Sequence, residues 1–116
     1  MPKPSDLLQG TLDLLILKTL AREPMHGWGI AKRIQLLSGE VLSVQQGSLY
    51  PALHRLEKKG LVASKWAMST DRNRELRVYR LTAKGKTQLL REESRWKQIT
   101  EAIARLMWPA DAGRTR

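Results

Sequence analysis

Residues 45–59 of the chain read QQGSLYPALHRLEKK. Three leucines in this stretch, Leu49, Leu53 and Leu56, are spaced i, i+4 and i+7, so they share one face of a helix. Polar side chains flank them and occupy the opposite face. The stretch therefore predicts a short helix that is anchored by its leucines and presents amide, hydroxyl, imidazole and guanidinium groups outward.

The ends of this helix are marked by three residues. Pro51 fits only in a first turn, because proline lacks the amide hydrogen that later turns need. Ser48 is accordingly expected to be the N-cap, and Gly60 to end the helix.

Two further helices are predicted before this one. Residues 7–22 carry leucines and an isoleucine over more than one stripe, which indicates a helix contacted from several sides. Pro24 ends it. A second helix is expected over 27–38, with Gly39 placed to terminate it.

A β-hairpin and a long helix are predicted after it. Residues 61–68 and 75–81 mix β-branched and aromatic side chains, and the polar stretch 69–74 between them has the composition of a hairpin tip. Thr82 is the expected N-cap of the last helix. Its apolar positions recur with heptad-like spacing at Leu89, Trp96, Ile99, Ile103 and Leu106.

Composition narrows the class of protein. At 116 residues the chain is long enough for one core and too short for two ordinary domains. It has no cysteine, which removes disulfides and thiolate chemistry. No apolar stretch is long enough to span a membrane, and no signal peptide is recognised, so we expect a cytoplasmic protein. A net charge of +10 favours an anionic partner, with nucleic acid ahead of an anionic membrane.

The predicted order is that of a winged helix-turn-helix, a mainly α fold with a small β-hairpin (α+β) and a long C-terminal helix. This arrangement holds one helix in the major groove of double-stranded DNA while the hairpin, the wing, reaches a neighbouring groove or phosphates. The expected DNA-binding residues lie on the third helix and at the tip of the wing: Gln45, Gln46, Ser48, Tyr50, His54, Arg55, Arg72, Asn73 and Arg74.

Several of these side chains also have a structural interpretation. Tyr50 either contacts phosphate or packs against the base of the wing, and Arg77 and Arg80 either extend the positive surface or form the solvated face of a strand. Lys58 and Lys59 are explained equally well by the helix dipole and by DNA. His26 and His54 lack metal-ligand spacing and carboxylate company, so neither a metal site nor an enzymatic activity is expected, and no cofactor.

Two motifs, MHGWGIAKRI at 25–34 and QQGSLYPALHRLEKKGLV at 45–62, together with VYRLTAKG at 78–85, resemble the PadR family of transcription regulators. The resemblance covers roughly residues 7–107. Trp28 departs from it, since the family usually has Tyr there. The resemblance implies a homodimer that binds a palindromic operator, usually as a repressor released by a small molecule, with the last helix packed against the partner's first helix.

The apolar patterns of the first and last helices agree with a dimer. Residues 1–82 are the expected DNA-binding domain, 83–108 the dimerisation helix and 109–116 a flexible tail. Trp96 and Ile99 are candidate contacts for a small planar hydrophobic effector; alternatively, Trp96 simply fills the interface. The competing function is a protein-interaction module that binds an acidic partner. The expected interface residues are Leu8, Leu12, Leu15, Leu89, Trp96, Ile99, Ile103 and Leu106.

Overall fold

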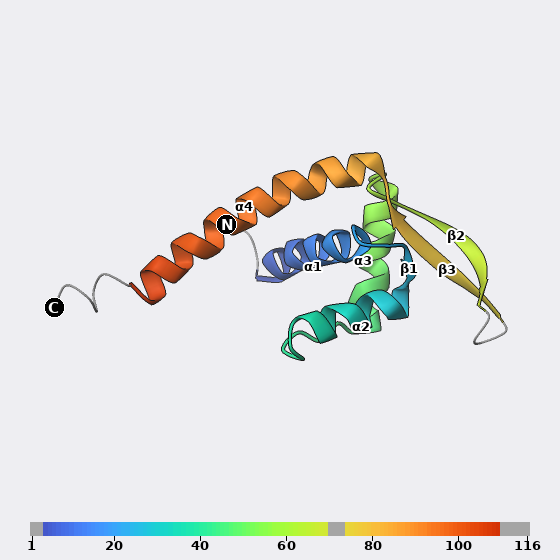
Figure 1. The fold of residues 1–116 in the computed structure, drawn as a ribbon, viewed down its shortest axis with the longest axis horizontal. Helices are drawn as coiled ribbons and strands as arrows, with labels where there is room; N and C mark the ends of the chain where they lie inside the picture. The colour runs from blue at the N-terminus through green and yellow to red at the C-terminus, as the bar shows by residue number, and fades with distance from the viewer. Residues whose placement is uncertain (1–3, 70–73, 110–116) are drawn as a thin grey trace.

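A computed structural model describes residues 4–69 and 74–109, with side chains from Gly10 onward. Four helices and a small antiparallel sheet make up the fold, which is the predicted winged helix-turn-helix with a long C-terminal helix (Figure 1). The elements in chain order are α1 (Pro4–Leu20), β1 (Met25–His26), α2 (Gly27–Leu37), α3 (Gln46–Lys58), β2 (Val62–Ser69), β3 (Arg74–Leu81) and α4 (Ala83–Met107).

One hydrophobic core joins α1, α2, α3, the base of the sheet and the first turns of α4. The predicted leucines of α3 lie at its centre, each no more than 1% exposed. Burying this apolar surface is the main source of stability and fixes the orientation of α3. The core consists of Ile16, Leu17, Leu20, Ile30, Ile34, Leu49, Ala52, Leu53, Leu56, Leu61, Val62, Tyr79, Leu81 and Leu89.

The sheet has the strand order β1-β3-β2, and both pairings are antiparallel. Val62 pairs with Leu81 at the buried base of the hairpin, and Ser69 pairs with Arg74 at its outer end. The two-residue strand β1 was not predicted, because a pairing this short carries no alternating pattern. It pairs Met25 with Tyr79 and so ties the start of α2 to the wing.

The predicted N-cap of α3 is wrong. The helix begins at Gln46, the cap position is occupied by Gln45 in an extended conformation, and no side chain caps it. Ser48 lies inside the first turn, and Pro51 lies in the second turn. The expectation that Pro51 falls in the first turn is therefore also wrong, and the helix forgoes the hydrogen bond from residue 51 to the Gly47 carbonyl. The correction leaves both glutamines at the very end of the helix, where a ligand can approach them.

α4 has two parts with different surroundings. Its start is capped by Thr82, whose hydroxyl accepts a hydrogen bond from the Gly85 amide at 3.0 Å, as predicted. Lys18 of α1 pairs with Glu93 at 2.6 Å, but every residue from 94 to 109 is exposed. Figure 1 shows α4 passing over α1 and continuing beyond the body of the molecule. None of the helices in the described ranges is long and apolar enough to cross a membrane.

Candidate nucleic-acid interface

α3 presents a polar face that the rest of the described chain leaves uncovered. Gln45, Gln46, Ser48 and His54 are all exposed, as the sequence predicts. The leucines on the opposite side are buried, so these side chains project from a backbone that is held rigidly. Gln and Ser side chains can hydrogen-bond base edges or phosphates. The major groove of B-DNA is wide enough to admit an α-helix that presents such a face.

Arg55 lies apart from this group. Its guanidinium donates a hydrogen bond to the Asp13 carboxylate of α1 at 2.8 Å, and the two side chains are 30% and 18% exposed. Burial raises the pKa of the Asp13 carboxyl, while the hydrogen bond and charge of Arg55 act in the opposite direction. Arg55 therefore connects α3 to α1, a role that its position in the sequence did not indicate.

The wing carries both paired and outward-facing cations. Arg77 donates from Nε to the Ser64 hydroxyl at 2.9 Å, approaches the Glu57 carboxylate at 3.5 Å and lies 5.6 Å from the ring centre of Trp66. This network fixes the base of the wing against α3. Arg74 is exposed at the start of β3. The other two predicted wing contacts, Arg72 and Asn73, lie outside the described residues.

Tyr50 packs against the start of α2. A Cβ atom added to Gly27 would lie 2.7 Å from the Tyr50 hydroxyl, so only glycine allows the phenol ring to lie this close to the backbone. The ring nevertheless remains 43% exposed. This contact is with α2 and not the predicted packing against the base of the wing, and the contact of Tyr50 with phosphate stays a prediction.

His26 lies close to the wing and to the start of α3, a position that the sequence did not reveal. It is the N-cap of α2, and its Nδ1 accepts a hydrogen bond from the Gly29 amide at 3.0 Å. The ring stacks on Trp28 with centroids 6.0 Å apart, and the Lys32 ammonium lies 5.0 Å from the ring centre of Trp28. The two-residue strand β1 pairs with β3 and so places His26, Trp28 and Lys32 next to the wing. No local sequence pattern predicts this placement.

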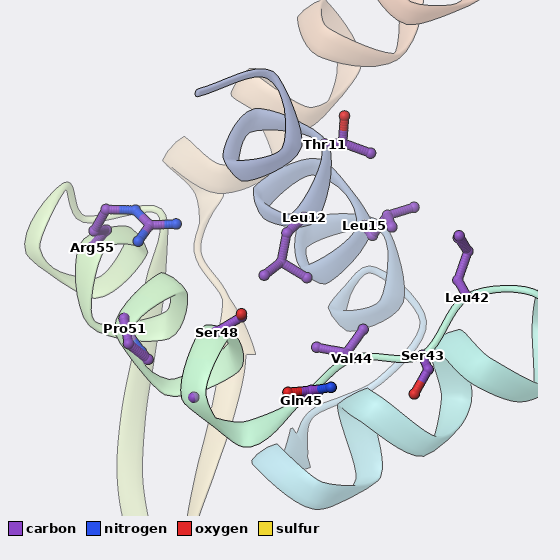
Figure 2. Close-up of a pocket in the computed structure, with 11 residues that line it drawn as sticks. Thr11, Leu12, Leu15, Leu42, Ser43, Val44, Gln45, Ser48, Pro51 and Arg55 are labelled. Atoms are coloured by element: carbon purple, nitrogen blue, oxygen red, sulfur yellow. The ribbon is translucent and has the colours of Figure 1, made fainter. Parts of the chain in front are cut away.

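An open groove lies beside the polar face of α3 (Figure 2). It has a volume of about 690 Å³ and runs between α1, the loop that follows α2, and the first turns of α3. Apolar side chains form most of its walls, and Gln45 and Ser48 form part of its edge. The lining residues are Thr11, Leu12, Leu15, Leu42, Ser43, Val44, Gln45, Gly47, Ser48, Pro51 and Arg55.

The predicted dimer residues fall into three groups. Leu12 and Leu15 are half-buried and line the groove, whereas the side chain of Leu8 is outside the described part. Leu89 is 5% exposed and belongs to the core of its own chain, because α4 crosses the base of the sheet there. The remaining four form an exposed apolar stripe on α4: Trp96 (42%), Ile99 (44%), Ile103 (52%) and Leu106 (81%).

Comparison with known proteins identifies the family. The model of the transcriptional regulator PadR-like family matches residues 16–91, which include α2, α3, the wing and the start of α4. The chain belongs to this family. A transcriptional regulator of Mycobacterium tuberculosis is 36% identical to this PadR-like chain over 90 residues, 78% of this chain and 79% of the relative.

Solved structures of PadR-like and related regulators have the same fold. A PadR family regulator from Eggerthella lenta has a TM-score of 0.71 with 31% identity, over 90% of this chain and 88% of that chain. A transcriptional regulator from Clostridium thermocellum has a TM-score of 0.76 with 27% identity, over 90% and 97%. These relatives support a DNA-binding transcription regulator. No group of side chains suited to holding a metal ion occurs among the described residues.

Proposed function

We propose that this PadR-like chain is a homodimeric repressor that binds a palindromic operator through α3 and the wing. The observation that carries the proposal is the rigid, uncovered polar face of α3, with Gln45, Gln46, Ser48 and His54 exposed opposite fully buried leucines. A two-fold dimer places two such helices about one DNA turn apart, which is why a palindromic site is expected.

The dimer is supported by two unpartnered apolar surfaces on the same chain. The α4 stripe carries large side chains that are 42–81% exposed, and the groove of α1 and α3 is walled by apolar residues. Exposed apolar surfaces of this kind mark interaction sites. We assign the outer end of the α4 stripe of a second copy, Ile103 and Leu106, to the groove, and Trp96 and Ile99 to the region of the two-fold axis. This is an isologous arrangement in which each copy contributes both surfaces. The partner helix would then lie beside Gln45 and Ser48, next to the DNA-reading face.

DNA selection tests the proposed function. Purified protein is used to select duplexes from a random pool, and we expect an inverted repeat to be enriched. The double variant Gln46→Ala, His54→Ala should lose preference at defined positions, since both side chains are exposed outside the groove and would contact base edges. Gln98→Ala is the matched control, because Gln98 is exposed on α4 away from the apolar stripe. Unchanged preference in the double variant would instead favour a module that binds an acidic protein through its basic surface.

A small planar hydrophobic molecule is proposed to release the repressor from DNA. Trp96 and Ile99 are exposed on the stripe, and two Trp96 indoles facing each other across a dimer axis would sandwich a planar hydrophobic ligand. A planar aromatic dye should quench indole fluorescence and weaken operator binding. Trp96→Ala should abolish both effects, whereas Trp108→Ala, at an exposed helix end, should preserve them. Dye binding that survives Trp96→Ala would contradict this site.

A further inference from the structure

A second, smaller hollow lies where three elements converge. Its volume is about 180 Å³, and it is bounded by the start of α2, the start of α3 and the edge of β3. At about 30 Å³ per water this is room for roughly six water molecules, whereas pockets for drug-sized ligands measure about 300–1,000 Å³. The hollow therefore suits a single small group. The lining residues are His26, Gly27, Trp28, Gln46, Tyr50, Arg74, Leu76 and Arg77.

The polar groups around this hollow are mainly donors. Because Nδ1 of His26 accepts from the Gly29 amide, the ring proton is on Nε2, and Nε2–H is the donor that His26 has left to offer. The Gln46 amide, the Tyr50 hydroxyl and two guanidinium groups line the same space. No carboxylate is among the lining residues. This donor set recognises an anion with several acceptor oxygens.

The two arginines differ in how far they are neutralised. Arg77 is near Glu57, at 3.5 Å, and its Nε already donates to Ser64. Arg74 is exposed and forms no ion pair with any carboxylate whose side chain the structure describes, in residues 10–69 and 74–109. Arg74 therefore supplies the main uncompensated charge of the hollow, while the Glu57 network holds Arg77 and the wing in position.

We propose that this hollow seats one backbone phosphate of the DNA duplex, with His26 and Arg74 as its principal ligands. The inference rests on the proposed function and adds a ligand site to it. Gln46 and Tyr50 belong both to the hollow and to α3, so an anion bound here lies beside the helix that enters the major groove. This phosphate would belong to the DNA strand that passes between α3 and the wing. Trp28, which is 47% exposed, and Lys32 continue the same surface along α2.

Three variants test the phosphate seat. Arg74→Gln removes the charge, and Arg80→Gln is the matched control, because Arg80 is exposed on the same strand and does not line the hollow. His26→Asn removes Nε2–H but keeps a side-chain oxygen that can cap α2. Circular dichroism and thermal melting establish whether each variant is folded. If His26→Asn does not fold, Arg74→Gln still tests the proposal, because it changes only an exposed side chain.

Binding of each variant to a selected duplex is measured by fluorescence anisotropy over a series of salt concentrations. Because a dimer carries two such hollows, Arg74→Gln should reduce the slope of log K against log salt by about 1.8, which is about 0.9 for each lost phosphate contact. Arg80→Gln should leave the slope unchanged. His26→Asn should weaken binding of the dimer about 100-fold, which is about tenfold for the hydrogen bond lost in each protomer. Unchanged slope in Arg74→Gln together with unchanged affinity in His26→Asn would overturn the proposal.

Chemical substitution of the DNA separates a backbone phosphate from a free one. Single phosphates of the duplex are replaced with neutral methylphosphonate. At one position in the half-site, the replacement should weaken DNA binding by the wild-type protein but not by Arg74→Gln. Inorganic phosphate alone should not raise the melting temperature of the wild-type protein; a rise that His26→Asn abolishes, without a coupled methylphosphonate position, would assign the hollow to free phosphate and overturn the proposal. Failure of the wild-type protein to select any duplex would contradict the proposed function itself, whereas selection without these couplings contradicts only the phosphate seat.

Discussion

The body of the molecule and the outer half of α4 have similar apolar patterns and opposite surroundings. In α3 the leucines at i, i+4 and i+7 are no more than 1% exposed. On α4 the large apolar residues from Trp96 to Leu106 are spaced in the same way and are 42–81% exposed. Periodicity thus states that a helix has an apolar face, but not whether that face meets its own chain or another.

The difference follows from geometry. The chain has a principal extent of 63 Å against 27 and 26 Å in the other two directions, because α4 runs on past the point where α1 can cover it (Figure 1). Among the described residues, the ion pair between Lys18 of α1 and Glu93 is the outermost one that links α4 to α1. Beyond that point no described residue of the same chain covers the stripe, so the stability of the body does not depend on its burial.

The largest effect is expected from a cavity in the body. Leu53 is completely buried, and Leu53→Ala should lower the free energy of unfolding by about 2–5 kcal/mol, since it removes packed methyl groups that nothing replaces. Urea denaturation at a fixed protein concentration measures this. Val41→Ala, at a residue that is 79% exposed, should change the value by less than about 0.5 kcal/mol. Equal effects of the two variants would show that burial in the body is not what holds it together.

The next effect concerns assembly and not folding. Ile103→Glu places a charge on the α4 stripe and should raise the dimer dissociation constant at least about 100-fold, because an unpaired charge would have to be buried. The helical content should be retained. Leu90→Glu is the control: Leu90 is 69% exposed on the opposite side of α4, so this charge should change the constant less than about threefold. Sedimentation velocity over a concentration series distinguishes the two variants, and a dimer that tolerates Ile103→Glu would contradict the proposed interface.

Within the body, the sequence predicted what depends on local pattern. The helices, the hairpin, the Thr82 cap and the buried leucines follow from spacing and from residues with strong local preferences. The pairing of Arg55 with Asp13 joins residues 42 positions apart and depends on how α1 crosses α3, which spacing does not determine. The predicted cap at Ser48 failed because it assumed that Pro51 must lie in the first turn, whereas the helix begins at Gln46 and places Pro51 in its second turn.

The candidate site was predicted in part for the same reason. The polar face of α3 could be deduced, because it is the complement of a buried face. The contribution of His26 could not, since it requires a strand of two residues to place the start of α2 next to β3. Residues contributed by one helix are accessible to pattern analysis, whereas a site where three elements converge requires the tertiary structure.

A smaller effect is expected at the junction between the two regions. The Thr82 hydroxyl accepts from the Gly85 amide at 3.0 Å and lies 2.7 Å from the Gly60 carbonyl oxygen, so it joins α4 to the turn after α3. Thr82→Ala should lower the free energy of unfolding by about 1 kcal/mol. Thr82→Ser retains the hydroxyl and should recover most of this loss. Thermal or urea unfolding monitors both variants, and an equal loss in Thr82→Ser would point to the methyl group instead of the cap.

The smallest effect is a pH dependence at the contact between α1 and α3. Burial raises the pKa of Asp13 above its ordinary value, against the opposing influence of Arg55, so the folded state binds this proton more tightly than the unfolded state does. The resulting stabilisation is fully present below the unfolded-state value, about 3.9, and is lost as the pH rises through the folded-state pKa.

Asp13→Asn removes this titration. The free energy of unfolding of the wild type relative to Asp13→Asn should therefore fall as the pH rises from about 3.9. Arg55→Gln should make the fall steeper, because it removes the group that lowers the pKa of Asp13. Urea denaturation at a series of pH values measures these differences. If the wild type instead gains stability over Asp13→Asn with rising pH, the attraction of Arg55 outweighs burial, and the contact between α1 and α3 is held by charge more than by packing.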